Sequence, residues 1–559
     1  MAYQLDVSAV PCFTKIIEKA IVEHWEMASL SDFQGTTLYY KDVARKIEKL
    51  HILFENSGVK QGDKIAICGR NCANWAVVFF ASITYGAVTV PLLAEFTADQ
   101  IHNTVNHSDA KLLFVGDYVA SIIDAKQMPA LEGIINIPDF SILESRSDEL
   151  TFAREHLNEM FGKKYPKFFR KEHVSYYEEP DPNAMCLINY TSGTTGYSKG
   201  VMIPYRSMWS NLDFALERMN KLLHPGENYI SMLPLGHMFG AAFELVFPFV
   251  AGRHIHFLNR TPSPQVLLKA YAEIKPTLVI SVPLVIEKII RKKVFPKIQT
   301  HKMKILMHTP GIGKKIRAKI REQVTKAFGG KFFEIVVGGA AFNQEVEKFL
   351  RMEEIPYCVG YGATECGPLI AYTHWMDIKP GSCGKPCSHI EVEIDSVDPV
   401  NIPGEILVRG LNVMLGYYKA DELTKKTIDE DGWYHTGDLG VMDEDKFIFI
   451  KGRSKNMLLG ANGQNIYPEE IEDKLNNMPL VNESIVVQRE QKLVGLVYPD
   501  YDEAKNLGLN KNDIMEVMEQ NRLKLNDDLP VYSKVTKMEL QSKEFEKTAK
   551  RSIKRFLYK

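Results

Sequence analysis

Hydrophobic and polar positions change between two periods along most of this 559-residue chain. Short apolar runs rich in β-branched residues indicate buried strands, and longer stretches with helical spacing separate them. The clearest runs are residues 112–118, 186–192, 277–283 and 332–339. This alternation predicts an α/β fold with largely parallel sheets, in which ligands collect at the carboxyl ends of the strands. Tyr190, Gly338 and Gly360 are expected just after such strands and therefore at one crevice.

The stretch between Arg70 and Glu95 contains no charged residue and is long enough for a transmembrane helix. Within it, NWAVVFFASITYG has the composition of an apolar helix that ends at Gly86, and AVTVPL that of a short strand that ends at Pro91. We therefore predict a buried helix, turn and strand, with a membrane span as the alternative. The first residues, MAYQLDVSAVPCF, have no basic segment before an apolar run, so a cleaved signal peptide is not expected and a cytoplasmic location is predicted.

The chain is longer than one hydrophobic core usually serves, so at least two domains are expected. The boundary is predicted at residues 451–455, between a large domain (1–450) and a small one (456–559). The small domain should begin with a helix at Tyr467 and contain a second helix near residues 513–525. Its mixture of helices and strands predicts a small α+β lid.

Composition and charge exclude some classes of function. The formal net charge of −2 argues against a nucleic-acid-binding protein, because phosphate backbones are held by clustered Lys and Arg. The eight cysteines are scattered and have no histidines at zinc-ligand spacing. Reduced cytosolic thiols are therefore expected.

Residues 190–200, YTSGTTGYSKG, concentrate hydroxyl side chains, glycines and one lysine. Glycines let successive N–H groups converge on an anion, hydroxyls add donors, and the lysine adds a positive charge. The spacing differs from a Walker A loop, in which the last glycine directly precedes Lys. We predict a phosphate-binding loop of another type, with a ligand-free flexible loop as the alternative. Its candidate phosphate ligands are Thr191, Ser192, Gly193, Thr194, Thr195, Gly196 and Lys199.

This loop resembles the signature of adenylate-forming enzymes, which include acyl-CoA ligases, amino-acid-activating domains and luciferases. Four further segments are similar to elements of that family and follow in the family's order. They are GYGATECGP (360–368), GEILVRGLNVMLGYY (404–418), DGWYHTGDLG (431–440) and KGRSKNMLLGANGQNIYPEEIE (451–472). Because residues 62–75 and 86–92 also agree, the resemblance covers almost the whole chain.

The resemblance implies a two-step reaction. A carboxylate attacks the α-phosphate of ATP to give an acyl-adenylate and pyrophosphate, and the thiol of CoA then displaces AMP. The site must neutralise the charge of two anions. By the resemblance, Lys199 and the loop hydroxyls hold the β- and γ-phosphates, Glu365 holds Mg²⁺, and Thr364 donates to the α-phosphate.

The resemblance also implies a nucleoside site. Tyr361 would stack on adenine, Gly339 and Ala340 would border the adenine and the acyl group, and Asp438 with Arg453 would hold the ribose. Two neighbouring residues also belong to the implied ATP site, Gly362 and Ala363.

For the second step, the resemblance implies that the small domain rotates about Lys455 and that Gly463 lines the path of the CoA pantetheine. Glycine suits such a path because it lets a ligand approach the backbone closely. His237 matches the family's gate beside the reacting carboxylate, although a histidine of the hydrophobic core is the alternative. The same resemblance implies an acyl path lined by His237, Phe239, Gly240 and Gly338.

One departure from the family pattern concerns the C-terminus. The family has an essential lysine before an Ile and a basic residue, and here that slot is Ser552. Lys550 is the candidate to supply the charge instead, with Arg551 and Lys554 as alternatives. Asn456 in place of an Asp is a milder departure.

The substrate class is partly readable. Amino-acid-activating members have an aspartate at the slot occupied here by Gly240, so an amino acid is not expected. Residues 90–113 and 281–290 resemble long-chain fatty acyl-CoA ligases, which implies a fatty acid of medium to long chain. Two other functions stay open: transfer of the acyl group to a carrier-protein phosphopantetheine, and a non-enzymatic acyl or nucleotide binder that has lost the adenylation lysine.

Basic and aromatic residues are mixed between Phe161 and Lys171. Such a mixture can lie at a lipid interface, so weak peripheral association with membranes is predicted. A solvated surface helix or loop is the alternative, because the apolar positions lack a sustained helical period.

Overall fold

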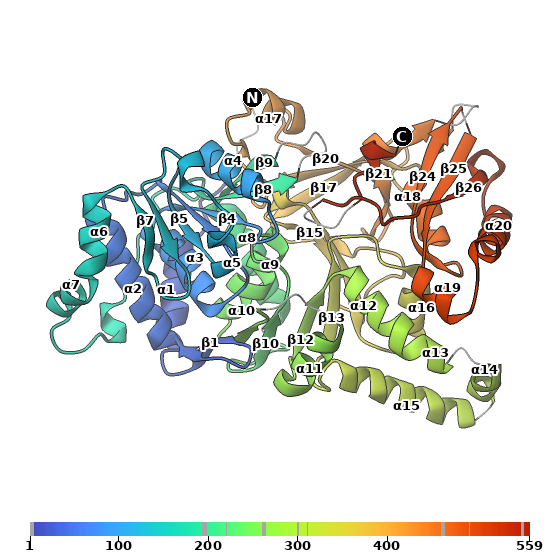
Figure 1. The fold of residues 1–559 in the computed structure, drawn as a ribbon, viewed down its shortest axis with the longest axis horizontal. Helices are drawn as coiled ribbons and strands as arrows, with labels where there is room; N and C mark the ends of the chain where they lie inside the picture. Colours follow the sequence, from blue (N-terminus) through green and yellow to red (C-terminus); the bar gives the residue numbers. More distant parts are fainter. Residues whose placement is uncertain are drawn as a thin grey trace.

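The computed structural model consists of a large α/β domain followed by a smaller C-terminal domain, which lies on the right in Figure 1. This is the fold class predicted from the alternation of periods. The described residues are 5–192, 198–219, 221–259, 264–298, 301–309, 311–459, 464–490, 492–548 and 553–558.

An eight-stranded sheet of order β19-β9-β8-β4-β3-β5-β6-β7 forms the centre of the large domain. Its middle strands, from β8 to β6, are parallel, whereas β19, β9 and β7 are antiparallel to their neighbours. The strands are β3 (Lys64–Cys68), β4 (Val88–Leu92), β5 (Ala110–Val115), β6 (Gly133–Asn136), β7 (Ile142–Ser145), β8 (Met185–Ser192), β9 (Ser198–Pro204) and β19 (Gly416–Tyr417).

Three more sheets complete the large domain. Two are parallel on one side and antiparallel on the other, of order β12-β13-β14-β15-β16 and β10-β11-β1-β2, and the third is antiparallel, of order β17-β18-β20-β21. Their strands are β1 (Ala28–Asp32), β2 (Thr37–Tyr39), β10 (Asn228–Ser231), β11 (His254–Phe257), β12 (Leu278–Ser281), β13 (Glu334–Gly338), β14 (Tyr357–Gly362), β15 (Leu369–Tyr372), β16 (Lys385–Pro386), β17 (Ile390–Asp395), β18 (Gly404–Gly410), β20 (Tyr434–Met442) and β21 (Ile448–Arg453).

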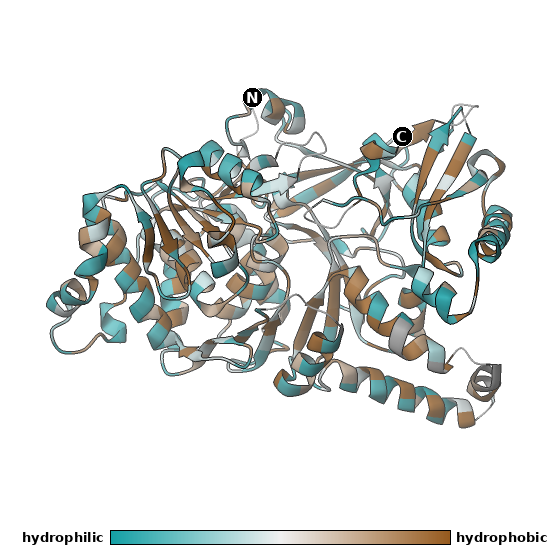
Figure 2. Cartoon of the chain, viewed as in Figure 1, coloured by the Kyte–Doolittle hydropathy of each residue, from teal (hydrophilic) through white to brown (hydrophobic). Residues whose placement is uncertain are grey.

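Helices cover these sheets. Figure 2 shows brown strands in the interior and teal faces on the surrounding helices, as expected when each helix buries one apolar stripe. The helices of eight or more residues in the large domain are α1 (Phe13–Glu23), α2 (Tyr40–Asn56), α3 (Ala73–Tyr85), α4 (Ala98–Ser108), α6 (Asp148–Glu155), α7 (Leu157–Lys164), α8 (Tyr205–Met219), α11 (Pro264–Ile274), α14 (His301–His308), α15 (Ile312–Ala327) and α16 (Gln344–Met352).

The uncharged stretch folds as predicted, into a buried helix, a turn and a strand. Helix α3 ends at Gly86, whose φ of 84° places it in the left-handed region that glycine adopts readily, and β4 follows directly. Trp75 and Phe79 of α3 are fully buried in the protein core. Among the described residues, no helix combines the length and the apolar character needed to cross a membrane.

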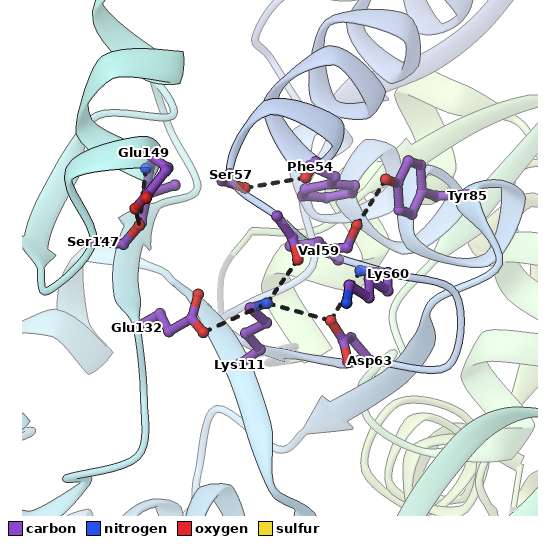
Figure 3. A network of polar contacts seen from close by, with 12 residues as sticks. Phe54, Ser57, Val59, Lys60, Asp63, Tyr85, Lys111, Glu132, Ser147 and Glu149 are labelled. Carbon is purple, nitrogen blue, oxygen red and sulfur yellow. Dashed lines mark hydrogen bonds and ion pairs between the residues drawn. The ribbon is translucent and has the colours of Figure 1, made fainter.

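A polar network fastens the connection between α2 and β3 to the central sheet (Figure 3). Lys111 of β5 donates from Nζ to the carbonyl of Gly58 at 2.7 Å and lies 3.5 Å from carboxylate oxygens of Asp63 and Glu132. Tyr85, at the end of α3, donates its hydroxyl to the carbonyl of Val59 at 2.8 Å. The network joins the chain before β3 to the start of β5. Its residues do not line the candidate site, so its role is structural.

The small domain has a hydrophobic core of its own, built around Leu475, Val497 and Leu525. The predicted helices at Tyr467 and near residues 513–525 are confirmed as α18 and α20, and α18 begins with a proline at its first position. Its regular elements are α18 (Pro468–Leu475), α19 (Tyr501–Asn506), α20 (Lys511–Asp527), β22 (Leu458–Leu459), β23 (Asn465–Ile466), β24 (Val481–Arg489), β25 (Lys492–Pro499) and β26 (Val535–Leu540).

Three predicted strand ends need correction. Gly338 is the last residue of β13 and not the residue after it, Tyr190 lies inside β8, and Gly360 lies inside β14. Strands β8 and β14 continue because they pair with an antiparallel neighbour after the apolar run ends. The sequence did not show that the strands continue, because the residues that extend them are not part of an apolar run.

Candidate active site

A cavity of about 1860 Å³ lies between the two domains and extends into the large domain. Both domains contribute to its wall. The described candidate residues that line it are Thr191, Lys199, His237, Phe239, Gly240, Gly338, Gly339, Ala340, Tyr361, Gly362, Ala363, Thr364, Glu365, Asp438, Arg453, Lys455 and Lys554. Residues that the sequence spreads over more than three hundred positions therefore meet at one site.

The phosphate-binding loop connects two antiparallel strands. Strands β8 and β9 pair Thr191 with Lys199, so both residues stand at the base of the loop. Gly193, Thr194, Thr195 and Gly196 lie outside the described residues, as does the side chain of Ser192. The phosphate-binding role of this loop stays a prediction.

Tyr417 of β19 joins the base of the loop to Glu365. Its ring lies 5.0 Å below Lys199 Nζ, and its hydroxyl donates to Glu365 Oε1 at 2.9 Å. Sequence reasoning did not select Tyr417, although it stands in the quoted segment 404–418. Its pairing partner is Val201 of β9, which places Tyr417 beside the loop.

Glu365 fits the metal-binding role that the resemblance implies. It lies in the short helix η5 (Thr364–Cys366) on the cavity wall, with one carboxylate oxygen engaged by Tyr417. No cluster of three or more His, Cys, Asp or Glu suited to a metal occurs in the described part of the chain. Mg²⁺ commonly takes one or two carboxylates together with substrate phosphates and water, so a single carboxylate suits it.

The predicted nucleoside side of the cavity contains a chain of three contacting side chains, Tyr361, Asp438 and Arg453. Tyr361 donates its hydroxyl to Asp438 Oδ2 at 2.7 Å, and Arg453 Nε lies 2.7 Å from Asp438 Oδ1. Strands β20 and β21 pair Asp438 directly with Arg453, which explains the alignment. Because Asp438 is buried and both its oxygens are engaged, its position is fixed, while its remaining lone pairs can accept from a ribose hydroxyl.

Gly339 follows β13 with a φ of 88°, a left-handed conformation that favours glycine. It turns the chain so that Gly339 and Ala340 are exposed to the cavity. Thr364, in η5 after β14, lines the same cavity. The parallel pairing of β13 with β14 brings these two turns to one edge of the sheet.

The predicted acyl side of the cavity consists of a turn and a short helix. His237 precedes α9 (Met238–Gly240), which continues into the π-helical turn η3 (Ala241–Val246). A Cβ atom on Gly338 would lie 3.0 Å from Cζ of Phe239, so this glycine lets the ring lie against β13. A Cβ atom on Gly240 would lie 2.6 Å from the carbonyl oxygen of Pro234. Gly240 is therefore required by backbone packing, a reason that the sequence did not show.

Glu244 in η3 holds the turn that carries His237. Its Oε2 accepts the N–H groups of Met232 and Leu233 at 2.8 and 2.7 Å, just before that turn. The side chain is fully buried, and burial raises the pKa of its carboxyl group well above the usual range. Sequence reasoning missed Glu244, although a lone charged residue in the apolar run 238–251 was a usable signal.

The predicted hinge residue lies at the junction of the two domains. Lys455 belongs to η6 (Ser454–Asn456), directly after β21. Desolvation in the cavity wall lowers the pKa of Lys455, and the charges of Arg453 and Lys199 lower it further. Asn456 donates from Nδ2 to Glu469 Oε1 of α18 at 2.6 Å. Gly463 lies outside the described residues.

The C-terminal segment returns to the cavity wall. Arg555 pairs with the buried Glu472 of α18, whose pKa burial raises to about 7, and Lys554 Nζ lies 3.5 Å from Glu546 Oε2. Lys550 and Ser552 lie outside the described residues, so the predicted replacement of the adenylation lysine stays a prediction. Among the described residues of this segment, Lys554 is the cation beside the cavity without a buried carboxylate partner.

The basic and aromatic segment 161–171 is less open than the sequence suggested. Phe161, Tyr165 and Phe169 pack against one another at ring distances of 4.9–5.8 Å, and Phe169 is buried. Only Phe168 is largely exposed among these aromatic residues, at 72%. Phe161 and Tyr165 contact Lys49 and Glu48 of α2, and Phe169 lies against Trp25. Membrane association of this segment stays a prediction.

Comparison with known proteins agrees with this geometry. The profile of the AMP-binding enzyme family matches residues 17–418, and that of the AMP-binding enzyme C-terminal domain matches residues 455–558. The chain belongs to the AMP-binding enzyme family. The first match alone spans well over half of the chain and includes the phosphate-binding loop, His237 and Glu365.

Curated relatives of this AMP-binding enzyme include long-chain-fatty-acid–CoA ligases. The ligase FadD15 of Mycobacterium bovis is 29% identical over 489 residues, which cover 83% of this chain and 78% of the relative. A long-chain-fatty-acid–CoA ligase of Escherichia coli O157:H7 is 28% identical over 474 residues, covering 79% and 78%.

Solved structures share the fold of this AMP-binding enzyme. The anthranilate CoA ligase AuaEII in complex with anthranoyl-AMP superposes with a TM-score of 0.78 at 19% identity, covering 99% of this chain and 98% of that one. The O-succinylbenzoate coenzyme A synthetase of Bacillus subtilis in complex with ATP and magnesium ion gives 0.72 at 18% identity, covering 97% and 98%. At this identity the likeness concerns the fold.

Proposed function

We propose that this AMP-binding enzyme is an AMP-forming fatty acyl-CoA ligase. It would convert a fatty acid and ATP to an acyl-adenylate and pyrophosphate, and then transfer the acyl group to CoA with release of AMP. One observation carries the proposal: a single cavity joins the cationic loop base and Glu365 to an apolar branch beyond His237. The names of the curated relatives support a fatty acid as substrate.

At the phosphate side, Lys199 holds the β- and γ-phosphates together with the loop, and Thr364 donates to the α-phosphate. Glu365 would hold Mg²⁺, which neutralises phosphate charge when bound. Tyr417 restricts the Glu365 carboxylate to one orientation by its 2.9 Å hydrogen bond. These groups reduce the repulsion between the attacking carboxylate and the phosphates.

At the nucleoside side, Asp438 accepts the ribose hydroxyls and Arg453 fixes that carboxylate. Adenine packs against Tyr361, with Gly339 and Ala340 at its edge. The 2.7 Å contacts of Asp438 with Tyr361 and Arg453 fix the carboxylate that would accept these hydroxyls, which lowers the ordering cost of nucleotide binding.

At the acyl side, His237 borders the reacting carboxylate, and the alkyl chain extends past Phe239 into the large domain. Buried apolar residues line that branch, among them Met232, Leu258 and Leu278. Each methylene buried there contributes about 0.8 kcal/mol, which favours a medium to long chain.

For the second step, we propose that residues 451–455 form the hinge between an AMP-binding and acyl-binding domain (1–450) and a lid domain (456–559). Rotation would replace the C-terminal segment at the cavity by the loop that contains Gly463, along which the pantetheine of CoA approaches. The separate core of the small domain supports such a rotation as a unit. We also propose a weak peripheral association with membranes, where the water-insoluble substrate is stored.

The test is a comparison of acyl acceptors. Purified protein receives ATP, Mg²⁺ and fatty acids of increasing length, with free CoA, with a holo carrier protein or with neither. The proposal expects AMP release and a thioester with CoA. A thioester formed only on the carrier protein would replace CoA as acceptor, and binding of fatty acid without AMP or pyrophosphate release would leave a non-enzymatic binder.

A further inference from the structure

Positive charge is concentrated in one segment of a chain that is nearly neutral overall. Residues 288–326 contain thirteen Lys and Arg against a single acidic residue, Glu322, while the whole chain has a net charge of −2. This segment includes α14 and α15. In Figure 1, α15 runs along the lower edge of the molecule and α14 lies at its outer corner.

Helix α15 has two different faces. Its inner face packs against α11 through the buried residues Ile320 and Val324. Lys315 and Lys319 are one helical turn apart on the opposite, exposed face, and Lys326 lies further along it. Lys314 is exposed beside them.

The inner and outer cations differ in their partners. Arg317 Nη1 lies 2.5 Å from Glu353 Oε1, and Arg321 Nε donates to the Glu353 carbonyl at 2.8 Å, so both arginines are fixed to the domain. Lys314, Lys315 and Lys319 form no ion pair with any residue that the structure describes. Their charges face solvent and are available to a partner.

Two exposed isoleucines accompany these lysines. Ile305 of α14 is 57% exposed and Ile312, at the start of α15, is 48% exposed. Lysines around exposed aliphatic side chains are the composition of a surface that rests on a lipid interface, where the aliphatic groups enter the headgroup boundary and the lysines meet anionic lipids.

We propose that the α14–α15 surface, defined by Ile305, Ile312, Lys314, Lys315 and Lys319, docks on an anionic lipid bilayer. Charge complementarity selects a negatively charged partner, and the exposed isoleucines favour a bilayer over an acidic protein. Segment 161–171 is the weaker candidate because Lys163 and Lys164 are paired with Glu159 and Glu48.

The location also suits substrate uptake. Helix α12 (Pro283–Ile289) lines the cavity with Pro283, Leu284 and Val285, and the chain continues from α12 through α13 (Phe295–Ile298) into α14. Docking through α14 and α15 would hold this wall of the acyl cavity near the bilayer. The docking proposal names a surface for the membrane association proposed above, and the link to uptake rests on the proposed ligase function.

The experiment measures binding of the full chain to two kinds of vesicle: pure phosphatidylcholine, and phosphatidylcholine with phosphatidylglycerol in equal parts. The test variant combines Lys314→Glu, Lys315→Glu and Lys319→Glu. The control combines Lys163→Glu, Lys167→Glu and Lys171→Glu, which changes the charge equally on the other surface. AMP formation from a medium-chain fatty acid shows that each variant is folded, and Ile305→Ser provides a second test with no charge change.

The proposal expects wild type to bind the anionic vesicles at low salt and to lose binding as salt rises. The partition coefficient of the α15 variant for anionic vesicles should fall at least about tenfold below that of wild type, and that of Ile305→Ser should fall less. The control should stay within about twofold of wild type. Equal loss in both charge variants, or no binding of wild type to anionic vesicles, would overturn the proposal. Absence of AMP formation by the wild-type protein with medium- and long-chain fatty acids would instead count against the proposed function.

Discussion

Glu365 is the residue on which the proposed first step depends most. Glu365→Gln keeps the shape of the side chain and its contact with Tyr417 but removes the charge that would hold Mg²⁺. We expect pyrophosphate release to fall at least about a hundredfold, while ATP binding weakens but persists because the loop contacts remain. Pyrophosphate release and ATP binding are measured separately.

The matched control is Tyr417→Phe, which removes only the 2.9 Å hydrogen bond to Glu365. Its rate of pyrophosphate release should fall far less. Unchanged turnover in Glu365→Gln would remove Glu365 from the metal site.

Glu244 supports His237 from inside the core. Glu244→Ala leaves the N–H groups of Met232 and Leu233 unpaired and creates a cavity, at a cost of about 2–5 kcal/mol in the free energy of unfolding. Glu244→Gln should keep most of the stability, because burial already favours the uncharged carboxyl group. Denaturant unfolding measures both variants.

The same pair of variants tests whether Glu244 positions the acyl side. We expect Glu244→Ala to raise KM for the fatty acid more than KM for ATP, and Glu244→Gln to restore the fatty-acid KM. An equal rise in both KM values would mean that Glu244 only stabilises the fold.

At this scale the sequence predicted the residues of the cavity better than their contacts. Tyr361, Asp438 and Arg453 were expected at one site, but the sequence could not show that Asp438 links the other two. Asp438 and Arg453 are fifteen positions apart and become neighbours only because β20 and β21 pair. The contact between Glu365 and Tyr417 depends on the pairing of β19 with the central sheet. A strand of two residues is too short to be predicted from the sequence.

The hinge is the element whose movement the account requires. Lys455→Pro fixes φ at a position that must change it, so we expect adenylate formation to survive and thioester formation to stop. Lys455→Ala removes the charge but leaves φ free, and it serves as the control for the side chain. Fatty-acid-dependent ATP–pyrophosphate exchange and acyl-CoA formation report the two steps separately. Equal loss of both steps in the proline variant would contradict rotation about residues 451–455.

The contact between the domains should respond to pH. Asp473 of α18 has its pKa raised to about 6, first by burial and then by Glu287 of α12 and Glu347 of α16, with Arg291 and Lys474 opposing. Because its pKa is higher in the folded protein, Asp473 contributes most stability below its unfolded pKa of about 4 and loses that contribution as pH rises through about 6.

The variant Asp473→Asn removes this titration. We expect its thermal unfolding midpoint to match wild type near about pH 4 and to exceed it near about pH 7.5. Asp527→Asn, at the exposed end of α20, is the control and should show no such pH-dependent gain. An identical pH dependence for wild type and Asp473→Asn would show that the carboxylate does not titrate against the domain contact.

Elements with a single clear period were predictable, and those defined by tertiary pairing were not. The stretch from Ala73 to Leu92 folds as expected because an apolar helix, a glycine stop and a β-branched run each have a local cause. The inward packing of Phe161, Tyr165 and Phe169 was not predictable, because their partners are more than a hundred residues away in the sequence. These partners are Lys49 and Glu48 of α2 and, for Phe169, Trp25. The face of α15 that carries free lysines likewise depends on which arginines meet Glu353.

The whole molecule places two kinds of chemistry in one cavity between two domains. The charged part holds Lys199, Glu365 and Asp438, and the apolar part extends beyond His237 into the large domain. The expected positions of Tyr190, Gly338 and Gly360 near the ends of strands predicted part of this convergence, since parallel strands carry their following turns to one edge of a sheet. The size and lining of the apolar part of the cavity could not be predicted from the sequence, because its residues come from several sheets.

The most direct measurement of the account is ATP–pyrophosphate exchange by the wild-type protein in the absence of CoA. If the cavity activates a fatty acid as proposed, exchange should depend on added medium- or long-chain fatty acid and on Mg²⁺, and added CoA should yield AMP and acyl-CoA in equal amounts. Exchange without any fatty acid, or no exchange with any chain length while the folded protein still binds ATP, would contradict the account.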